Sequence, residues 1–296
     1  MAQRKLIEED LASLNSIKDL AESYEEIAVI RMQKIKDSVI RTRGFLVAIS
    51  DIYVDLKSSY NLEVKDLIKR MKRGEKTLLQ GLQKNGKILL VYLSSNGKLY
   101  GSVTQKTYRL FIEDLKKSEY ANSDLIIIGS AGKEMFEQSS SKKPYKYFEI
   151  PDTKVQLNHI KQLMNEFLKY ERVYIYYGKF GNVVNQNPIA SSITGEEIFE
   201  TEVKSVTNRE DKFIFEPSLE KIYHFFETQI MANLFSQTLL ENQLARHASR
   251  VNSMESALIN IEDETKKLKK MQVRLRHLIQ EKKQLETISG VLTLLD

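Results

Sequence analysis

The segment LARHASRVNSMESALINIEDETKKLKKMQVRL, residues 244–275, has an apolar residue at nearly every third or fourth position and contains no proline or glycine. It lies inside a longer run: no proline or glycine occurs between Pro217 and Gly290. This spacing predicts a helix that packs along one seam of a coiled coil. At 1.5 Å per residue the run would be about 100 Å long, too long for the interior of a compact domain. The apolar positions are Leu244, Ala248, Val251, Met254, Leu258, Ile261, Leu268, Met271, Leu275 and Leu278, with Thr265 among them; Lys282 interrupts the stripe, and Leu285, Ile288 and Leu292 resume it.

The first 73 residues predict a second helix of the same kind. They contain no proline and one glycine, Gly44, and Gly74 follows the basic residues at their end. Apolar residues again recur at steps of three and four, which places them on one helix face. Two such helices at opposite ends of a chain predict an antiparallel coiled coil. The positions in order are Leu14, Ile17, Ala21, Tyr24, Ala28, Ile35, Val39, Ile49, Ile52 and Leu56.

The residues between these helices have a different pattern, in which short apolar runs alternate with helical spacing. We expect strands at 88–94, 124–129, 145–150 and 172–177, and helices at 104–117 and 155–170. Strands that alternate with helices predict a Rossmann-like α/β domain with parallel strands. Further strand-like segments follow at 182–193, 198–206 and 213–215. The predicted domains are an N-terminal coiled-coil helix (1–73), an inserted α/β domain (74–215) and a C-terminal coiled-coil helix (216–296), whose start is marked by Pro217 and Ser218.

Composition excludes several classes of function. The 296 residues include no cysteine, which removes disulfides, thiolate metal sites and cysteine nucleophiles. With 45 basic and 40 acidic residues the net charge is only +5, so we expect no nucleic-acid partner. The longest apolar run, 88–93, is far too short to span a membrane, and acidic residues occupy the N-terminus where a signal peptide would be apolar. We expect a cytoplasmic protein without a membrane span, tied to a membrane only through partners.

No motif predicts catalysis, a cofactor or a metal. Gly129-Ser-Ala-Gly-Lys133 resembles a phosphate-binding loop, but Ile127 and Glu134 occupy the positions where that motif needs glycine and serine or threonine. The segment is therefore interpreted as a turn from strand to helix. The four histidines are scattered and form no ligand array, and no nucleophile has a base beside it.

Charged clusters lie on the C-terminal helix. The acidic run Glu262-Asp-Glu264 is typical of a solvated helix face. The basic residues have two interpretations: the exterior of a coiled coil, or a positive surface that meets acidic loops of a partner. They are Lys266, Lys267, Lys269, Lys270, Arg274, Arg276, Lys282 and Lys283.

Along nearly its whole length the chain resembles the gamma subunit, or central stalk, of F-type rotary ATP synthases. Ser16-Ile-Lys18 is similar to the family's S-I-K, with Lys34 at the distance of its later helix lysine. This is the first of seven segments that occur in the same order as in the family. The other six, each with the family motif it resembles, are 88–101 (the first strand and S-D-R-G-L-C-G turn), 126–136 (I-G-x-K-G-x-x-F), 173–188 (Y-N-x-F-x-S-x-x-x-Q-x-P), 215–218 (E-P-S), 248–260 (R-M-x-A-M-x-x-A-x-x-N) and Gly290 (the terminal glycine).

The chain also departs from the family pattern. Ser23-Tyr-Glu-Glu-Ile27 replaces I-T-x-A-M, and Ala245-Arg246 replaces the S-E before H-A-A-R. Arg276 matches the family's R-Q-x-x-I-T-x-E, while the glutamine, threonine and glutamate of that motif are His277, Glu281 and Lys283 here. These departures indicate a diverged paralogue of the kind found in wall-less, mycoplasma-like bacteria.

The resemblance implies a non-catalytic rotor shaft without cofactor or metal. Its partners would be alpha-like and beta-like subunits of a hexameric ATPase head, an epsilon-like subunit, and a membrane rotor ring or another driven component at the inner face of the cell membrane. The alternatives are a paralogue that drives motility or surface machinery rather than proton transport, a coiled-coil scaffold outside any motor, and a flavodoxin-like enzyme with helical arms. The residues expected to contact partners are Lys18, Lys34, Arg250, Met254, Arg276, His277, Glu281, Ile288, Leu292 and Leu295.

Overall fold

The computed structural model describes residues 2–59, 84–139, 141, 143–153, 155–194 and 219–292. The chain divides into two compact units, which are described separately. The helical unit consists of Met1–Val29 and Arg250–Asp296, and the sheet unit consists of Ile30–Ser249. The predicted domain boundaries at 73/74 and 215/216 lie outside the described residues, so they stay predictions.

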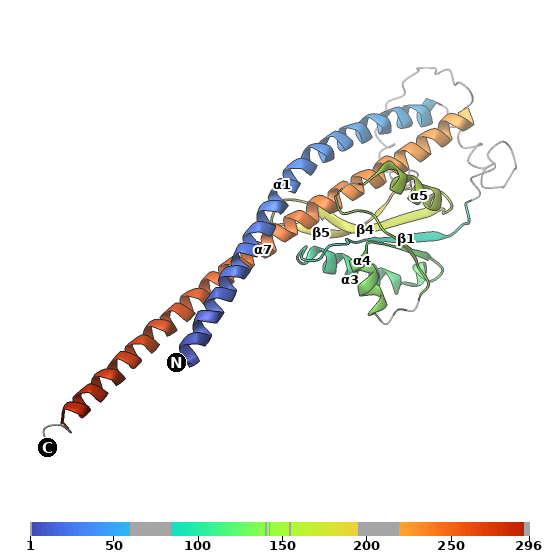
Figure 1. The fold of residues 1–296 in the computed structure, drawn as a ribbon. Coiled ribbons are helices and arrows are strands. Elements are labelled where there is room, and N and C mark those ends of the chain that lie inside the picture. The colour runs from blue at the N-terminus through green and yellow to red at the C-terminus, as the bar shows by residue number, and fades with distance from the viewer. Residues whose placement is uncertain are drawn as a thin grey trace. The chain divides into compact units, whose positions relative to one another are not determined.

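Two long helices contribute to both units and confirm the predicted fold class (Figure 1). Helix α1 spans Ala2–Ser59 and passes through Gly44 without a break. Helix α7 spans Leu219–Leu292, 74 residues in one element. In the helical unit, Tyr24 of α1 lies beside Arg250 of α7, while in the sheet unit Arg43 pairs with Glu241. The residue number falls along α7 as it rises along α1, so the pair is antiparallel.

Burial along α1 follows a strict seven-residue repeat. One series of positions with reduced exposure runs from Ile7 to Ile49 in steps of seven, and a second runs from Leu11 to Leu46. A sustained seven-residue period is the signature of left-handed coiled-coil packing. Ala21 and Ala28 belong to the first series, as predicted. Ile17 and Tyr24 are instead exposed, because Lys18 and Glu25 occupy the second series.

The C-terminal part of α7 has the same period. The predicted stripe is confirmed at Val251, Ile261, Leu268 and Leu275, which are buried or half-buried. Met271 and Leu278 were expected in the stripe but are exposed, and Gln272 and Ile279 take their places. Both corrections are shifts of one residue. The structure follows the seven-residue period even where it brings a glutamine to the seam.

The sheet unit contains a five-stranded sheet in the order β3-β2-β1-β4-β5. Strands β1 (Ile88–Leu93), β2 (Asp124–Ile128), β3 (Lys146–Phe148) and β4 (Arg172–Phe180) are parallel, as expected. Strand β5 (Gln186–Ser192) pairs antiparallel with β4, from Tyr174 opposite Ser192 to Phe180 opposite Gln186. It confirms the strand predicted at 182–193. The strands predicted at 198–206 and 213–215 lie outside the described residues.

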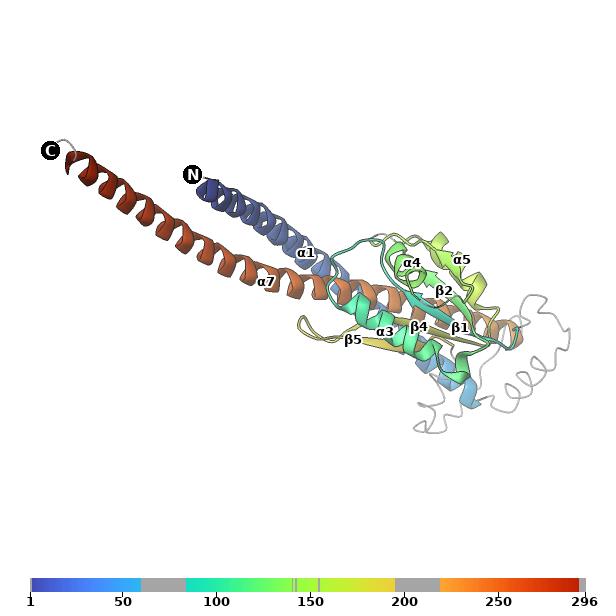
Figure 2. The same cartoon turned by 90° about the horizontal axis from the view of Figure 1, so that it is seen from below.

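Helices cover both faces of the sheet. Figure 1 shows α5 (Leu157–Phe167) and α7 on one face and α3 (Val103–Leu115) and α4 (Ser130–Glu137) on the other, and Figure 2 views the sheet from the α3 and α4 side. Alternate residues of β1 point to opposite faces: Leu89 and Val91 pack with α5 and α7, Leu90 and Tyr92 with α3 and α4. The parallel strands are buried on both sides and therefore read as continuous apolar runs. Among the described residues no helix is long and apolar enough to span a membrane.

Candidate functional site: a helix clamped to the sheet and an exposed helix end

The segment of α7 from Glu241 to Ser249 is buried at every position, although six of its nine residues are polar or charged. A buried polar group is costly unless it is hydrogen-bonded, and a buried charge unless it is paired. The partners of this segment therefore show what holds α7 in the sheet unit. They come from strands β1 and β4, from the loop after β3, and from α1.

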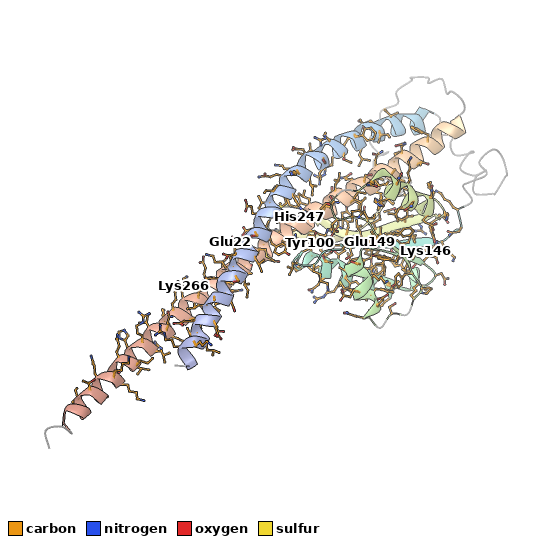
Figure 3. The ribbon with its side chains drawn as sticks, in the orientation of Figure 1. Glu22, Tyr100, Lys146, Glu149, His247 and Lys266 are labelled. Atoms are coloured by element: carbon orange, nitrogen blue, oxygen red, sulfur yellow. The ribbon has the colours of Figure 1, made fainter. Side chains whose placement is uncertain are left out.

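Arg246 makes the central contact. Its Nη1 donates to Asp152 Oδ1 at 2.7 Å, and both side chains are largely buried, at 6% and 16% exposed. The guanidinium lies over the ring of Tyr100, 4.9 Å from the centroid, and His247 meets the same ring edge-on at 5.7 Å (Figure 3). We call Tyr100, Asp152 and Arg246 the clamp. It joins α7 to two loops of the sheet unit through an ion pair and a cation–π contact.

Asp152 is also held by the turn after β1. The backbone N–H groups of Asn96 and Gly97 donate to its carboxylate at 3.1 and 2.7 Å. Burial alone would raise the pKa of Asp152, but the Arg246 guanidinium and these N–H donors outweigh it and hold that pKa below its ordinary value. Asp152 is therefore ionised at neutral pH, and the clamp is a charged pair.

Asn242 docks α7 on the ends of two strands. Its Oδ1 accepts the N–H of Gly178 in β4 at 3.1 Å, and its Nδ2 donates to the carbonyl of Leu93 at 3.3 Å. A side chain on Gly178 would not fit, because a Cβ there would lie 2.6 Å from Val103 Cγ2 and 3.4 Å from Ala245 Cβ. The glycine permits the close approach of α3 and α7 to this strand.

Glu241 ties α7 to α1. Its side chain is 2% exposed and accepts from Arg43 Nη2 at 2.8 Å and from Gln237 Nε2 at 2.9 Å. The carboxylate also lies near Tyr177 in β4; burial, then that negative charge, raises the pKa of the Tyr177 hydroxyl. Within the sheet unit α7 is thus held by α1 and by the sheet through separate ion pairs.

The glycine-rich turn at 129–133 is a structural turn, as interpreted from the sequence. Gly129 has φ +95°, and its Cβ position would lie 2.8 Å from the backbone of Ser95. The N–H of Ser130 donates to Asn96 Oδ1 at 3.0 Å, and the N–H of Ala131 donates to the carbonyl of Ser95 at 2.9 Å. These are the groups that a phosphate-binding loop would present to its ligand, and here they are used to fix the turn.

The residues expected to contact partners are spread along both helices. Arg250 is only 6% exposed, and its guanidinium lies over Tyr24, 5.4 Å from the ring centroid. Lys18 pairs with Glu22 on its own helix at 3.5 Å, and Met254 is half-buried. Leu292 is the last residue of α7, and Leu295 lies outside the described residues. The others are exposed: Lys34, Arg276, His277, Glu281 and Ile288. Partner contact stays a prediction for all ten.

The acidic run on α7 forms ion pairs with the basic cluster beside it. Asp263 pairs with Lys266 at 3.4 Å and Glu264 pairs with Lys267 at 2.6 Å, in each case three residues apart (Figure 3 labels Lys266). All four side chains are more than half exposed. Such pairs contribute little to stability, so this region agrees with the interpretation as a solvated helix face.

Sequence reasoning missed the clamp. In the sequence Arg246 differs from the family's S-E, and no motif marks Asp152 or Tyr100 as its partners. The signal available was the arginine itself, at a position where flanking residues Leu244 and Ala248 predict a buried helix face. A charge at such a position needs a partner. The sequence does not identify that partner, which lies 94 residues away.

These contacts hold α7 in the sheet unit. Within the described ranges, no group of three or more histidine, aspartate or glutamate side chains is arranged to hold a metal ion. The buried charges around α7 are engaged with one another, and they fix a long helix to a sheet.

Comparison with known proteins places this arrangement in a family. Residues 3–289 match the family model described as ATP synthase. The chain is 24% identical over 300 residues to the ATP synthase gamma chain of Cytophaga hutchinsonii, covering 98% of each protein.

Solved structures share the fold. The central stalk and c-ring structure of Tetrahymena thermophila mitochondrial ATP synthase contains a chain with a TM-score of 0.58 and 19% identity, covering 80% of this chain and 99% of that one. The rotor of the Euglena gracilis mitochondrial enzyme contains one with a TM-score of 0.62 and 12% identity, covering 94% and 99%. With the family model matched from residue 3 to residue 289, the chain belongs to the ATP synthase gamma-chain family.

Proposed function

We propose that this chain is the central rotor shaft of an F-type rotary ATPase and transmits torque through α7. The subunit itself is non-catalytic; the catalytic sites of the enzyme lie on beta subunits. One observation supports the shaft role most directly. Helix α7 is a single 74-residue element whose residues 241–249 are anchored in the sheet unit, whereas its residues 280–285 are all exposed.

Torque requires a joint that does not slip. In the sheet unit α7 is held to the sheet by the clamp and by Asn242, whose contacts would have to break before the helix could turn against the sheet, and the Arg43–Glu241 pair holds it to α1. Breaking a buried ion pair by removing one partner costs about 3–5 kcal/mol. Contacts of this kind are suited to hold a helix under load, where exposed pairs are not.

The exposed end of α7 would contact the hexameric head. Leu278, Leu285 and Ile288 are large apolar side chains that are more than half exposed on this part of the helix. Apolar surface of this extent fits a protein partner. Arg276, His277 and Glu281 lie on the same stretch and would meet polar groups of the alpha-like and beta-like subunits. A shaft that touches three sites unequally shifts each equilibrium tenfold for every 1.4 kcal/mol, roughly, of differential contact energy.

The sheet unit would carry the load at the other end of the transmission. Its partners in this proposal are an epsilon-like subunit and a membrane rotor ring or another driven component, which would keep the protein at the inner face of the cell membrane. The exposed basic residues near the end of α7, Arg274, Arg276, Lys282 and Lys283, would face acidic loops of the head, where charge contributes more to specificity and association rate than to affinity.

Co-purification with single-molecule rotation tests the proposal. The tagged chain should purify with a hexameric ATPase, and a bead attached to its sheet unit should rotate when ATP is added. A chain that purifies alone, or with a head that hydrolyses ATP without turning the bead, would contradict the shaft role and favour a scaffold.

A further inference from the structure

A stripe of apolar side chains on α1 is exposed to solvent. Ile17, Leu20 and Ile27 are between 43% and 59% exposed, and Tyr24 among them is 38% exposed. Their spacing of three and four residues places all four on one face of the helix. We call these four residues the α1 stripe. It covers about three turns, or roughly 15 Å of helix.

The α1 stripe lies beside the coiled-coil seam and not in it. Each of its residues comes one position before a residue of the seam, as Leu20 comes before Ala21 and Ile27 before Ala28. One residue turns a helix by about 100°, so the stripe is turned away from the seam by that angle. Packing of the seam against α7 therefore leaves the stripe outside the helix pair.

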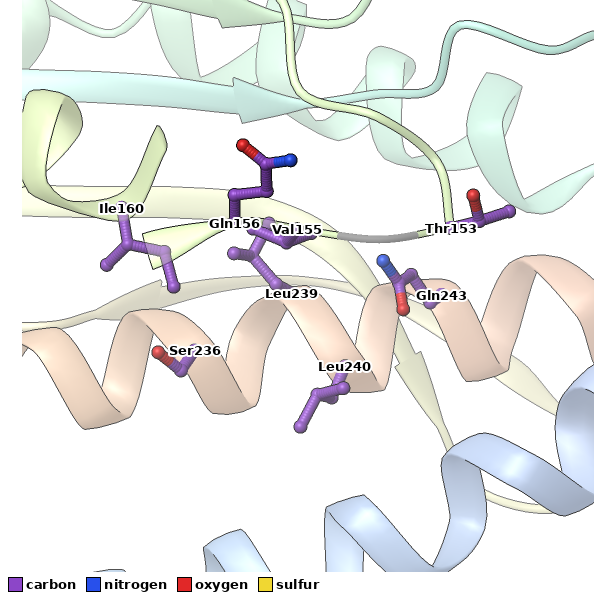
Figure 4. A pocket seen from close by; sticks show the side chains of 8 residues that line it. All are labelled: Thr153, Val155, Gln156, Ile160, Ser236, Leu239, Leu240 and Gln243. Carbon is purple, nitrogen blue, oxygen red and sulfur yellow. The ribbon is translucent and has the colours of Figure 1, made fainter. Parts of the chain in front are cut away.

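Apolar side chains elsewhere beside α7 are covered by the sheet. A hollow of about 550 Å³ lies between α7 and the start of α5 (Figure 4). Leu239 in its wall belongs to the core of the sheet unit, and Val155 and Ile160 pack against that core. The side chains of the α1 stripe are instead exposed, so they are the apolar surface that needs a partner.

The charge of α1 around the stripe is negative. Residues 19–30 include four acidic residues and no basic one, although the whole chain has a net charge of +5. Glu22 pairs with Lys18 at 3.5 Å, and Asp19 and Glu26 are exposed (Figure 3 labels Glu22). A partner that covers the stripe would thus meet carboxylates along its margins.

The neighbouring part of α7 adds negative charge and a small side chain. Residues 251–265 include four acidic residues and no basic one. Because Tyr24 lies beside Arg250 in an antiparallel pair, this segment runs alongside the residues of α1 that precede Tyr24. One heptad away from this contact, the register places Ala257 beside Ile17. A small residue there permits close approach of a third helix.

We propose that the α1 stripe binds a basic amphipathic helix of another protein. The apolar face of that helix, with residues at steps of three and four, would pack on Leu20 and Ile27. Lysine or arginine beside this face would meet the carboxylates of Asp19 and Glu26, whereas an acidic helix or an anionic membrane would be repelled. The inference goes beyond the shaft role, which assigns partners to the end of α7 and to the sheet unit.

Binding of two synthetic helices to the full-length chain tests this proposal. Each is about 18 residues long, or five turns, with leucine at steps of three and four. The remaining positions are lysine in one peptide and glutamate in the other. By fluorescence anisotropy the lysine peptide should bind, more weakly as salt is added, and the glutamate peptide should not.

Variants locate this binding on the stripe. Leu20→Ser combined with Ile27→Ser should weaken binding of the lysine peptide about tenfold or more, with unchanged helix content by circular dichroism. Asp19→Asn combined with Glu26→Gln should weaken it about threefold and reduce its salt dependence. Ile259→Ser is the matched control, because Ile259 is as exposed as Leu20 but lies on α7 outside the stripe, and it should leave binding unchanged.

Photo-crosslinking in the complex that purifies with the full-length chain identifies the natural occupant. Benzoylphenylalanine in place of Leu20 should label a segment of another protein that has apolar residues at steps of three and four and an excess of lysine and arginine. The same group in place of Ile259 should not label that segment. Four outcomes would overturn the proposal: no crosslink at Leu20, a crosslink to an acidic segment, crosslinks only to a second copy of this chain, or undiminished binding of the lysine peptide to the Leu20→Ser, Ile27→Ser variant.

Discussion

Two stretches of α7 lie in opposite environments. Residues 241–249 are buried at every position, whereas residues 280–285 are all exposed. Leu244 is 4% exposed and Leu285 is 68% exposed. Each stretch contains one leucine, so the presence of this residue does not by itself predict burial. The difference is the set of partners: the first stretch finds them within the chain, and the second would find them on another protein.

The comparison separates two kinds of contribution to a shaft. Contacts around residues 241–249 stabilise the fold and can be measured in the isolated chain. Contacts around residues 276–288 would appear only in the assembled motor. Substitutions in the first stretch should therefore change the free energy of unfolding, and those in the second should change rotation.

Removal of the exposed end should have the largest effect on function. A chain truncated after Lys270 loses the exposed apolar residues Leu278, Leu285 and Ile288 but keeps every contact of the clamp, so the sheet unit should stay folded while ATP hydrolysis no longer turns it. Circular dichroism and bead rotation measure the two properties. Lys267→Ala in the full-length chain is the control and should rotate normally. A truncated chain that turns the bead with unchanged torque would show that the end of α7 is not the working contact.

Breaking the clamp should have the largest effect on stability. Arg246→Leu leaves the Asp152 carboxylate buried without its counter-charge, and we expect a loss of about 3–5 kcal/mol in the free energy of unfolding, measured in urea. Asp152→Leu should do the same. The double variant should be more stable than the sum of the two losses predicts, because it leaves no unpaired charge. Additive losses would mean that the two side chains do not depend on each other.

A methyl group at Gly178 should push α3 and α7 away from β4. In Gly178→Ala the new Cβ would lie 2.6 Å from Val103 Cγ2, and overpacking of this kind costs about 1–3 kcal/mol. Gly44→Ala is the matched control: no atom lies within 4 Å of its Cβ position in the middle of α1, so it should stabilise the helix by about 0.5–1 kcal/mol. Equal effects at the two glycines would refute the close approach at β4.

The sequence predicted the helices and strands well because their signals are local. The absence of proline and glycine between Pro217 and Gly290 predicted α7, and the apolar runs predicted β1, β2 and β4. The one-residue errors at Met271 and Leu278 arose because steps of three and four fit several faces of a helix. The clamp was not predictable, since Asp152 and Arg246 meet only through the tertiary fold.

Acid should weaken the clamp. The pKa of Asp152 is lowered in the folded chain, so its contribution to stability is complete above the unfolded-state pKa of about 3.9 and is lost as the pH falls through the lower folded-state value. Asp152→Asn should therefore lose less stability than the unsubstituted chain between pH 5 and pH 2, roughly the range in which paired carboxylates are protonated. Glu166→Gln should reduce the acid effect independently, because Lys146 and Lys169 lower the pKa of Glu166. Urea midpoints at each pH measure both effects. An unchanged pH dependence in Asp152→Asn would show that the Asp152–Arg246 pair does not cause the loss of stability in acid.

The smallest effect should come from the exposed charge pairs of α7. Lys267 and Glu264 approach to 2.6 Å, slightly closer than Arg246 and Asp152 at 2.7 Å, so distance alone would rank the exposed pair as the stronger. Solvent screens the exposed pair, and its long side chains lose conformational freedom when they meet. Lys267→Ala should consequently leave the urea midpoint unchanged, where Arg246→Leu shifts it strongly. If Lys267→Ala destabilised the chain as much as Arg246→Leu, burial would not explain the difference in stability between the two ion pairs. The clamp would then not be the contact that holds α7 to the sheet unit.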